Sequence, residues 1–271
     1  MHDQAKSLRQ LVHQAPLRSA RTRPLITALT GAKGGVGTTT VALGLAVEMV
    51  CQGHSALLVD ADPDGGDVAT LCRLPDRWTV ADVLAGHRTV EEALQPGPGG
   101  LSVLAGAWGL DLMAECSAAT HERLVGQLRA LAAKVDLVLV DVGSGTSHLV
   151  RRWWRAADQV LLVTTPELPA VMDAYATIKV LSGGNGRLRL RSVVNLCDGA
   201  TQAADVHARL ARACARFLGI RLVPAGHLPC NPRLVQPGAK LQELTALAKA
   251  IGGGRRGSTC LQRACSQPAR S

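Results

Sequence analysis

The stretch Gly31-Ala32-Lys33-Gly34-Gly35-Val36-Gly37-Thr38-Thr39-Thr40 decides the fold class of this chain. An apolar run at Leu25–Thr30 predicts a strand before it, and a helix is predicted after it, from about Thr38 to Cys51. Closely spaced glycines let backbone N–H groups turn inward around phosphate oxygens, and the helix N-terminus adds its dipole. A strand, a glycine-rich loop and a helix in this order predict a phosphate-binding loop rather than a turn without a ligand.

Short apolar runs continue to alternate with helical stretches along the chain. They are found at Ala56–Asp60, Leu101–Leu104, Leu137–Val140, Val160–Thr164 and Arg191–Asn195, and a last helix is predicted at Leu241–Ile251. Continuous apolar strands between helices predict an α/β fold, in which a mostly parallel sheet has helices on both faces. We expect a domain at residues 25–251, an N-terminal extension with a basic linker at 1–24, and a basic tail at 252–271.

Composition narrows the class of protein. Hydrophobic residues make up 47% of the chain and aromatic residues only 2%, which predicts a large core of Ala, Leu and Val. No apolar run is long enough to span a membrane, and the N-terminus lacks a signal-peptide core, so we expect a cytoplasmic protein. The eight cysteines include no C-x-x-C pair, which favours separate reduced thiols over a metal site.

The net charge of +9 is concentrated at the two ends. Residues 1–24 carry five basic residues and one acid, and residues 252–271 carry four arginines and no acid. The predicted domain between them is therefore almost neutral, which argues against nucleic acid as its partner.

Acidic residues follow two of the predicted strands. Asp60 and Asp62 end the first one, whereas Asp64 is expected in a solvated turn. Asp141 ends the apolar run at 137–140 in a Walker B pattern, two residues before Gly143. Because carboxylates at the carboxyl ends of parallel strands face the ligand crevice, these acids are predicted beside the phosphate loop. Asp141 would support Mg²⁺, partly through water, and the Thr39 hydroxyl would bind it directly.

In this order the motifs resemble the MinD/ParA family of deviant Walker A ATPases, whose loop reads K-G-G-x-G-K-[ST]. The resemblance implies an ATP-sandwich homodimer in which Lys33 reaches the partner's nucleotide. It also implies that Asp60 is a switch acid, that Asp62 positions the attacking water and that Gly143 senses the γ-phosphate. Asn195 matches the residue that reads adenine, and Pro229 and Cys230 match the segment that covers it. The expected phosphate-binding residues are Gly34, Gly35, Val36, Gly37, Thr38, Thr39 and Thr40.

Thr38 departs from the family pattern, because it stands where the second lysine of the motif is expected. A lost charge-assisted hydrogen bond is worth about 1.5–3 kcal/mol, or roughly ten- to 150-fold in affinity, and this lysine also stabilises charge in phosphoryl transfer. Three hypotheses stay open: an ATP hydrolase with slow turnover, a pseudo-ATPase scaffold in pilus assembly, and a DNA-partitioning ATPase.

Three stretches resemble the flagellar-number regulators, the FlhG/FleN branch of the family. Asp3-Gln4-Ala5-Lys6-Ser7-Leu8-Arg9 is similar to the D-Q-A-x-x-L-R segment that stimulates the signal-recognition-type GTPase FlhF; the alternative is an ordinary amphipathic terminus. The other two are Leu101–Leu110 and a long helix at Ala203–Leu218, which is followed by a turn at Gly226–Pro229. The resemblance implies an ATP-dependent switch for the assembly or placement of a flagellum, with Asp3, Gln4, Ala5, Leu8 and Arg9 binding the partner.

Other clusters allow more than one interpretation. An apolar stripe in Leu241–Ile251 favours core packing over docking to an anionic membrane, although the arginine tail would add about 1 kcal/mol of attraction per charge, so peripheral membrane attachment stays open. In Arg151–Arg155 we expect one tryptophan to pack and the other to serve an interface. The alternation at Arg187–Arg191 predicts a half-exposed strand edge.

Overall fold

The computed structural model describes residues 23–65, 67–107, 116–183, 189–231 and 241–252. The D-Q-A-like segment at Asp3–Arg9, most of the basic linker and nearly all of the arginine tail lie outside the described residues.

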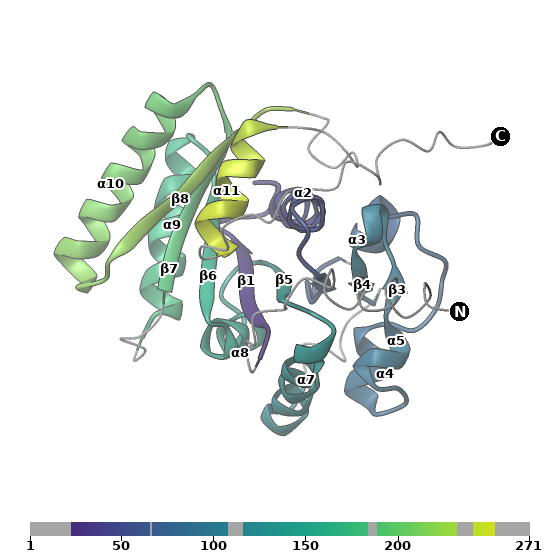
Figure 1. Cartoon of the computed structure of the whole chain (residues 1–271). Helices are drawn as coiled ribbons and strands as arrows, with labels where there is room; N and C mark the ends of the chain where they lie inside the picture. The colour runs from purple at the N-terminus through teal and green to yellow at the C-terminus, as the bar shows by residue number, and fades with distance from the viewer. Residues whose placement is uncertain (1–22, 66, 108–115, 184–188, 232–240, 253–271) are drawn as a thin grey trace, which may run out of the picture.

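Eight strands form a single sheet in the order β3-β4-β2-β5-β1-β6-β7-β8 (Figure 1). All neighbouring strands are parallel except β3 and β4. The predicted α/β class is therefore confirmed. The strands are β1 (Leu25–Gly31), β2 (Ala56–Asp60), β3 (Gln95–Pro96), β4 (Ser102–Leu104), β5 (Leu137–Ser144), β6 (Gln159–Thr164), β7 (Arg189–Cys197) and β8 (Leu222–Pro229).

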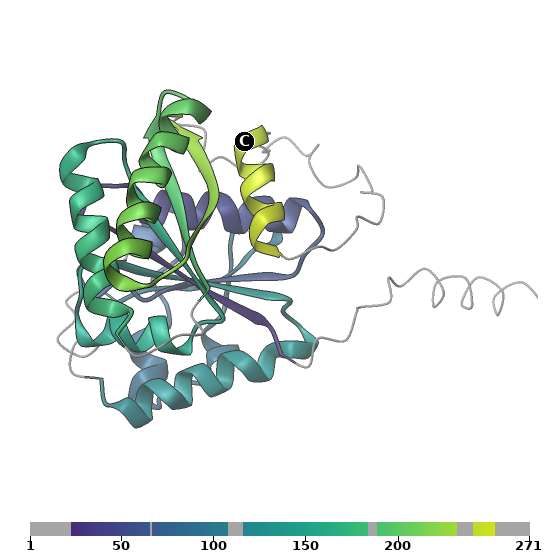
Figure 2. The ribbon, with the colours of Figure 1, turned by 90° about the vertical axis from the view of Figure 1, so that its left-hand side faces the viewer.

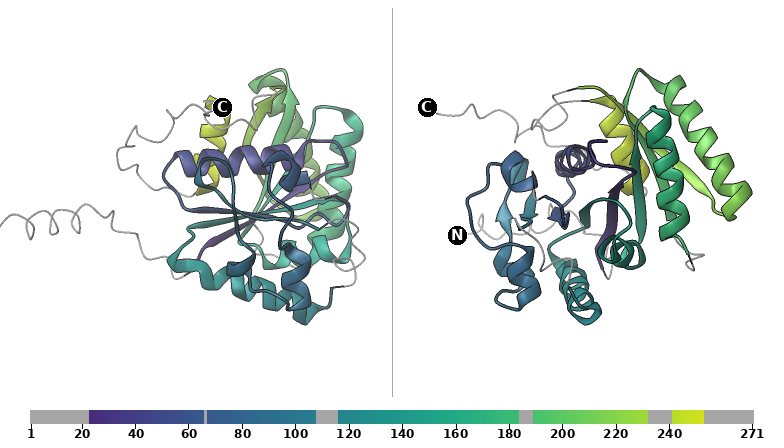
Figure 3. Two further views of the ribbon diagram at one scale, coloured as in Figure 1. Left: turned by 90° about the vertical axis from the view of Figure 1, so that its right-hand side faces the viewer. Right: turned by 180° about the vertical axis from the view of Figure 1, so that it is seen from behind.

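Helices cover both faces of this sheet, and the strands lie between two layers of helices (Figures 2 and 3). Side chains alternate between the layers: Val138 and Val140 of β5 join one apolar cluster, and Leu137 and Leu139 join the other. The helices are α2 (Thr38–Cys51), α3 (Asp67–Leu71), α4 (Val80–Ala85), α5 (Val90–Ala93), η1 (Pro98–Gly100), α7 (Ala118–Ala130), η2 (Leu131–Ala133), α8 (His148–Ala156), α9 (Leu168–Leu181), α10 (Ala200–Leu218) and α11 (Gln242–Gly252).

Local predictions differ from the structure at two places in the last strands. The turn expected at Gly226–Pro229 is wrong, because these residues form the second half of β8. For the half-exposed strand edge expected at Arg187–Arg191, the described residues Arg189–Arg191 do begin a strand with alternating exposure, but the edge position is wrong, because β7 lies between β6 and β8. Alternation by itself reports only that the two faces of a strand differ; the neighbours of a strand are set by pairing between segments distant in sequence.

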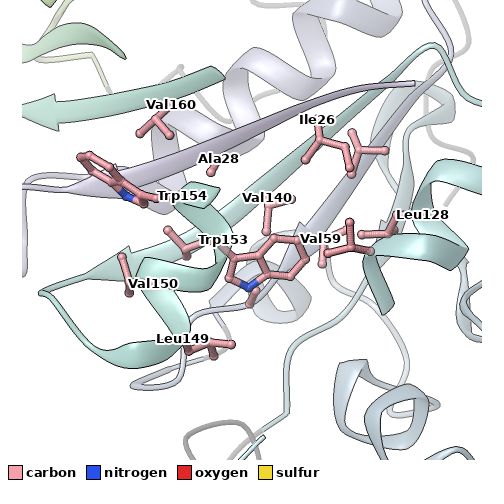
Figure 4. Packing of buried hydrophobic residues seen from close by; sticks show 14 of the residues in the cluster. Ile26, Ala28, Val59, Leu128, Val140, Leu149, Val150, Trp153, Trp154 and Val160 are labelled. Atoms are coloured by element: carbon pink, nitrogen blue, oxygen red, sulfur yellow. The ribbon is translucent and has the colours of Figure 1, made fainter. Parts of the chain in front are cut away.

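Both tryptophans of α8 belong to the core. Trp153 and Trp154 are each 1% exposed, and Figure 4 shows their indoles among Ala28, Val140 and Val160 of the sheet. The interface role expected for one of them is therefore wrong. In a chain with so few aromatic residues, these two rings fill space that Ala and Val cannot.

The last helix packs in the way that core packing predicts. Leu244, Leu247, Ala248 and Ile251 of α11 are each at most 2% exposed, and they join the cluster that contains α2. The stripe is therefore not available to a membrane in this state. Among the described residues, no helix combines the length and the apolar character that crossing a bilayer requires.

Candidate nucleotide site

The phosphate loop lies where β1 meets α2. Gly31 ends the strand, the N–H of Ala32 donates to the carbonyl of Val163 on β6 (2.8 Å), and Gly37 precedes the first turn of α2, which contains Thr38, Thr39 and Thr40. Gly37 has φ +84°, a left-handed conformation that favours glycine. Gly34 and Gly35 are exposed, and no atom lies within 4 Å of the position that a Cβ would take on either. The loop therefore has open space on its outer side.

Thr38 does not take the place of the missing lysine. Its side chain turns inward, and its Oγ1 lies 2.5 Å from the position that a Cβ on Gly31 would occupy. The residue is 8% exposed. Thr38 thus fills the space beneath the loop and adds no positive charge to it.

Thr39 and Asp141 meet behind the loop. Asp141 is fully buried on β5, where its Oδ1 accepts a hydrogen bond from the N–H of Gly143 (3.2 Å) and the nearby Thr39 hydroxyl favours the charged carboxylate. Burial raises the pKa of Asp141 to about 6, against the lowering effect of these two groups. Its Oδ2 is buried without a hydrogen-bond partner. A hydroxyl and a carboxylate with one unpaired buried oxygen are oxygen donors that fit Mg²⁺.

Asp60 lies next to Asp141 in the register of β2 and β5. It is 1% exposed and accepts hydrogen bonds from the N–H groups of Asp62 (3.4 Å) and Val68 (3.2 Å). Burial first, and then the Asp141 carboxylate, raise the pKa of Asp60 to about 8. Two buried carboxylates without a cation between them repel each other, so a metal ion or a proton would stabilise this pair.

Asp62 stands over Gly143. Its Oδ1 lies 2.2 Å from the position that a Cβ on Gly143 would occupy, and Gly143 has φ +69°. Burial raises the pKa of Asp62, and its Oδ1 accepts a hydrogen bond from the N–H of Asp64 (2.9 Å). Any larger residue at 143 would displace the carboxylate, so the two predicted switch elements touch here. Asp64 itself is exposed, as the sequence predicts.

Lys33 lies at the surface of the same site. Its Nζ forms an ion pair with Oε2 of Glu167 (3.1 Å), and the two side chains are 35% and 67% exposed. Glu167 is the residue that precedes α9. Lys33 is thus held by its own chain through an exposed contact of the kind that typically contributes 0–1 kcal/mol.

The residues predicted to bind adenine gather at the ends of β7 and β8. Asn195 is 1% exposed; its Nδ2 donates to the carbonyl of Val36 in the phosphate loop (2.9 Å), and its Oδ1 is buried without a partner. Pro229 pairs with Cys197 at the end of β8, and Cys230 beside it is exposed. The structure therefore brings Asn195 to the phosphate loop and Pro229 to the end of the neighbouring strand, and the contact of these three residues with a base stays a prediction.

Sequence reasoning missed the residues that support this site from other elements. Glu167 holds Lys33 across 134 positions of sequence, and Val68 of α3 and Gly106 after β4 contact Asp60. No local pattern marks any of them, because each contact depends on which strands become neighbours.

Comparison with known proteins agrees with this geometry. Residues 25–183 match the family model described as an AAA domain. The chain is 33% identical over 204 residues to the antiactivator FleN of Pseudomonas aeruginosa, covering 75% of this chain and 73% of FleN. The chain belongs to the MinD/ParA family of P-loop ATPases. Within that family it stands near the FlhG/FleN branch.

One further relative and two solved structures are also similar to this chain. The flagellum site-determining protein YlxH of Helicobacter pylori is 27% identical, over 60% of this chain and 55% of YlxH. The MinC:MinD cell division protein complex of Aquifex aeolicus contains a chain that superposes with a TM-score of 0.68 at 22% identity, covering 89% of this chain and 99% of that one. MinD of Pyrococcus horikoshii, solved with Mg-ADP, has a TM-score of 0.65 at 22% identity, over 83% and 94% of the two chains. These two structures share the MinD/ParA fold with this chain.

Proposed function

We propose that this protein is an ATP-dependent switch of the flagellar-number regulator type, with ATP and Mg²⁺ at Gly34–Thr40. The observation that carries the proposal is the meeting of four residues behind the loop. The Thr39 hydroxyl lies near the buried Asp141, and Asp62 lies against Gly143, two residues beyond Asp141. In this proposal, a sensor glycine next to a buried and a half-buried carboxylate couples the state of the nucleotide to the backbone around it.

The proposed cycle assigns a separate task to each residue. Inward N–H groups of the loop bind phosphate, and Asn195 with Pro229 and Cys230 holds the adenine. The Thr39 hydroxyl, and Asp141 through water, would hold Mg²⁺, which would supply positive charge to neutralise the phosphates. Asp62 orients the attacking water. Turnover is slow because Thr38 supplies no charge for the developing negative charge on the phosphoryl group.

Dimerisation on ATP is part of the same proposal. Lys33 would leave Glu167 and reach the partner's nucleotide. The first turns of α9 beside this ion pair expose Leu168 (67%) and Met172 (64%). A change at Glu167 would therefore alter the surroundings of an apolar surface on which a partner protein could dock.

Light scattering with size separation tests the dimer. The wild-type chain should be a monomer without nucleotide and a dimer with saturating ATPγS and Mg²⁺, and Lys33→Ala should stay monomeric while retaining most of its nucleotide affinity. Lys134→Ala is the matched control, because it breaks another exposed lysine–glutamate pair, with Glu91. A wild-type chain that stays monomeric would contradict the sandwich model.

A pseudo-ATPase scaffold is the second candidate function, and the inward-turned Thr38 is the observation that favours it. Steady-state ATP turnover separates the two. Activity that falls in Asp62→Ala supports a hydrolase. Activity no higher than that of a chain lacking the phosphate loop supports a scaffold.

The partner is proposed from the sequence resemblance, since Asp3–Arg9 lies outside the described residues. The full chain should stimulate GTP hydrolysis by an FlhF-type GTPase, and Gln4→Ala with Arg9→Ala should remove the effect. Arg21→Ala is the control for lost basic charge in the same extension. Salt-sensitive, ATP-dependent DNA binding in place of this stimulation would favour the DNA-partitioning alternative.

A further inference from the structure

A cavity of about 460 Å³ opens between α3, the segment that follows it, and the chain that leaves β4. Figure 1 shows α3, β3 and β4 grouped at one end of the sheet, away from α10. The polar residues among its described lining are Thr70, Arg73, Asp76, Arg77, Thr79 and Gln95. None of these residues belongs to the nucleotide site described above.

Two arginines dominate the charge of this cavity. Arg73 and Arg77 are exposed, and neither takes part in the ion pairs found between described residues. Asp76 is the one acid in the described lining. Arg73 lies two residues after the end of α3 and has φ +52°, a conformation that usually carries glycine where a helix ends. Guanidinium groups are the side chains that bind phosphate with paired hydrogen bonds, and two of them line this cavity.

Gln95 supplies a polar group that the fold itself does not satisfy. It is 5% exposed and lines the cavity, yet its Nε2 makes only a long hydrogen bond to the carbonyl of Trp78 (3.4 Å), and its Oε1 has no partner. Buried amides are normally paired on both sides. Gln95 is therefore a polar group in the cavity wall that still lacks a hydrogen-bond donor for its Oε1.

The walls of the cavity also touch the switch acid Asp60. The last turn of α3 lines the cavity. Near the start of the same helix, the N–H of Val68 donates to Oδ2 of Asp60 (3.2 Å). On the opposite wall, a Cβ on Gly106 would lie 2.8 Å from Cγ of Asp60. A ligand that moved either wall would therefore move the surroundings of Asp60.

We propose that this cavity is an effector site for a phosphorylated small molecule of mononucleotide size. Arg73 and Arg77 hold its phosphate and Gln95 pairs with its polar body. The volume lies within the range of small-molecule sites. Occupancy acts on Asp60 through α3 and Gly106; this coupling rests on the proposed nucleotide site, whereas binding in the cavity does not.

Isothermal titration calorimetry on the full chain tests the binding step. AMP, ribose 5-phosphate and inorganic phosphate are titrated with the phosphate loop saturated by ATPγS and Mg²⁺. We expect an organic phosphate to bind more tightly than inorganic phosphate. Arg73→Ser with Arg77→Ser should weaken it tenfold or more, and Gln95→Leu about three- to tenfold. Arg209→Ser with Arg212→Ser, which removes the same charge from the exposed face of α10, should leave the affinity within twofold.

Three results overturn the site: no probe binds, the cavity variants bind as well as the wild type, or inorganic phosphate binds as tightly as the organic probes. If ATPγS itself does not bind, the proposed function fails, and the same titrations without it still test the cavity.

A separate titration tests the coupling between the cavity and the nucleotide site. The dissociation constant of ATPγS should shift threefold or more when the bound probe is present in the wild type, and it should not shift in the double arginine variant. By linkage, ATPγS should shift the affinity of the probe by the same factor. A probe that binds without changing ATPγS affinity contradicts the coupling.

Discussion

The two sides of the phosphate loop differ in how far they are assembled before ligand arrives. On the carboxylate side, Asp60 and Asp141 are buried, and each accepts backbone hydrogen bonds. On the lysine side, Lys33 is exposed and bound to Glu167 by one surface ion pair. The half that we propose to bind the metal is thus preorganised, whereas the half that we propose to meet a second protomer would have to rearrange.

The difference between the carboxylate side and the lysine side fits the proposed ATP-dependent switch. Buried carboxylates that repel each other gain most from a cation, so Mg²⁺ with nucleotide should stabilise the carboxylate side strongly. A surface ion pair contributes little, so Lys33 can exchange one partner for another at small cost. Four changes test the comparison, in decreasing order of expected effect.

Asp141→Asn should have the largest effect, because it removes the buried charge that we propose to support the metal while preserving the shape of the side chain. We expect the affinity for ATPγS with Mg²⁺ to fall about 100-fold, with little change in EDTA. Fluorescence titration of a labelled nucleotide measures both. Asp205→Asn on the exposed face of α10 is the control. Equal losses with and without Mg²⁺ would mean that Asp141 is structural and that the carboxylate side is not a metal site.

Thr38→Lys tests whether the phosphate loop lacks only the positive charge of the missing second lysine. We expect tighter ATPγS binding by roughly tenfold, the lower end of the value of a charge-assisted hydrogen bond. The new side chain must leave the space beneath Gly31 to reach the phosphates. Thr38→Met separates length from charge and should gain nothing. An equal gain from both variants would remove the electrostatic explanation.

The pH dependence of stability probes the charge of the carboxylate side without nucleotide. The pKa of Asp60 is raised to about 8 in the folded chain, so its protonated form contributes to the free energy of unfolding. This contribution is fully present below the unfolded pKa of 3.8 and is lost as the pH rises toward 8. Urea unfolding should therefore show lower stability at pH 8 than at pH 5, by on the order of 1–3 kcal/mol from this group. Asp60→Asn should flatten the difference, and an unchanged pH profile in that variant would show that Asp60 is not its source.

Glu167→Gln should have the smallest effect and bears on the lysine side alone. Releasing Lys33 from an exposed ion pair should strengthen ATPγS-dependent dimerisation about two- to fivefold. Sedimentation velocity over a concentration series measures it. Glu91→Gln, which breaks the exposed pair with Lys134, is the matched control. Weaker dimerisation in Glu167→Gln would mean that Glu167 contributes to the interface and does not compete with it.

The sequence by itself determined the fold class and the order of the site's parts. The loop at Gly31–Thr40 and the acids Asp60 and Asp141 each follow an apolar strand, and parallel strands bring their carboxyl ends to one edge. Periodicity also predicted the buried stripe of α11. These features are local, so a single segment carries enough information to predict them.

Only the tertiary structure decided which distant residues meet. It paired Lys33 with Glu167, buried both tryptophans of α8 and placed Gly106 against Asp60. It also turned Thr38 inward and gathered Arg73, Arg77 and Gln95 around one cavity. Each of these contacts depends on strand order and on the packing of helices across the sheet, and these follow from the free energy of the whole chain rather than from the preference of any one segment.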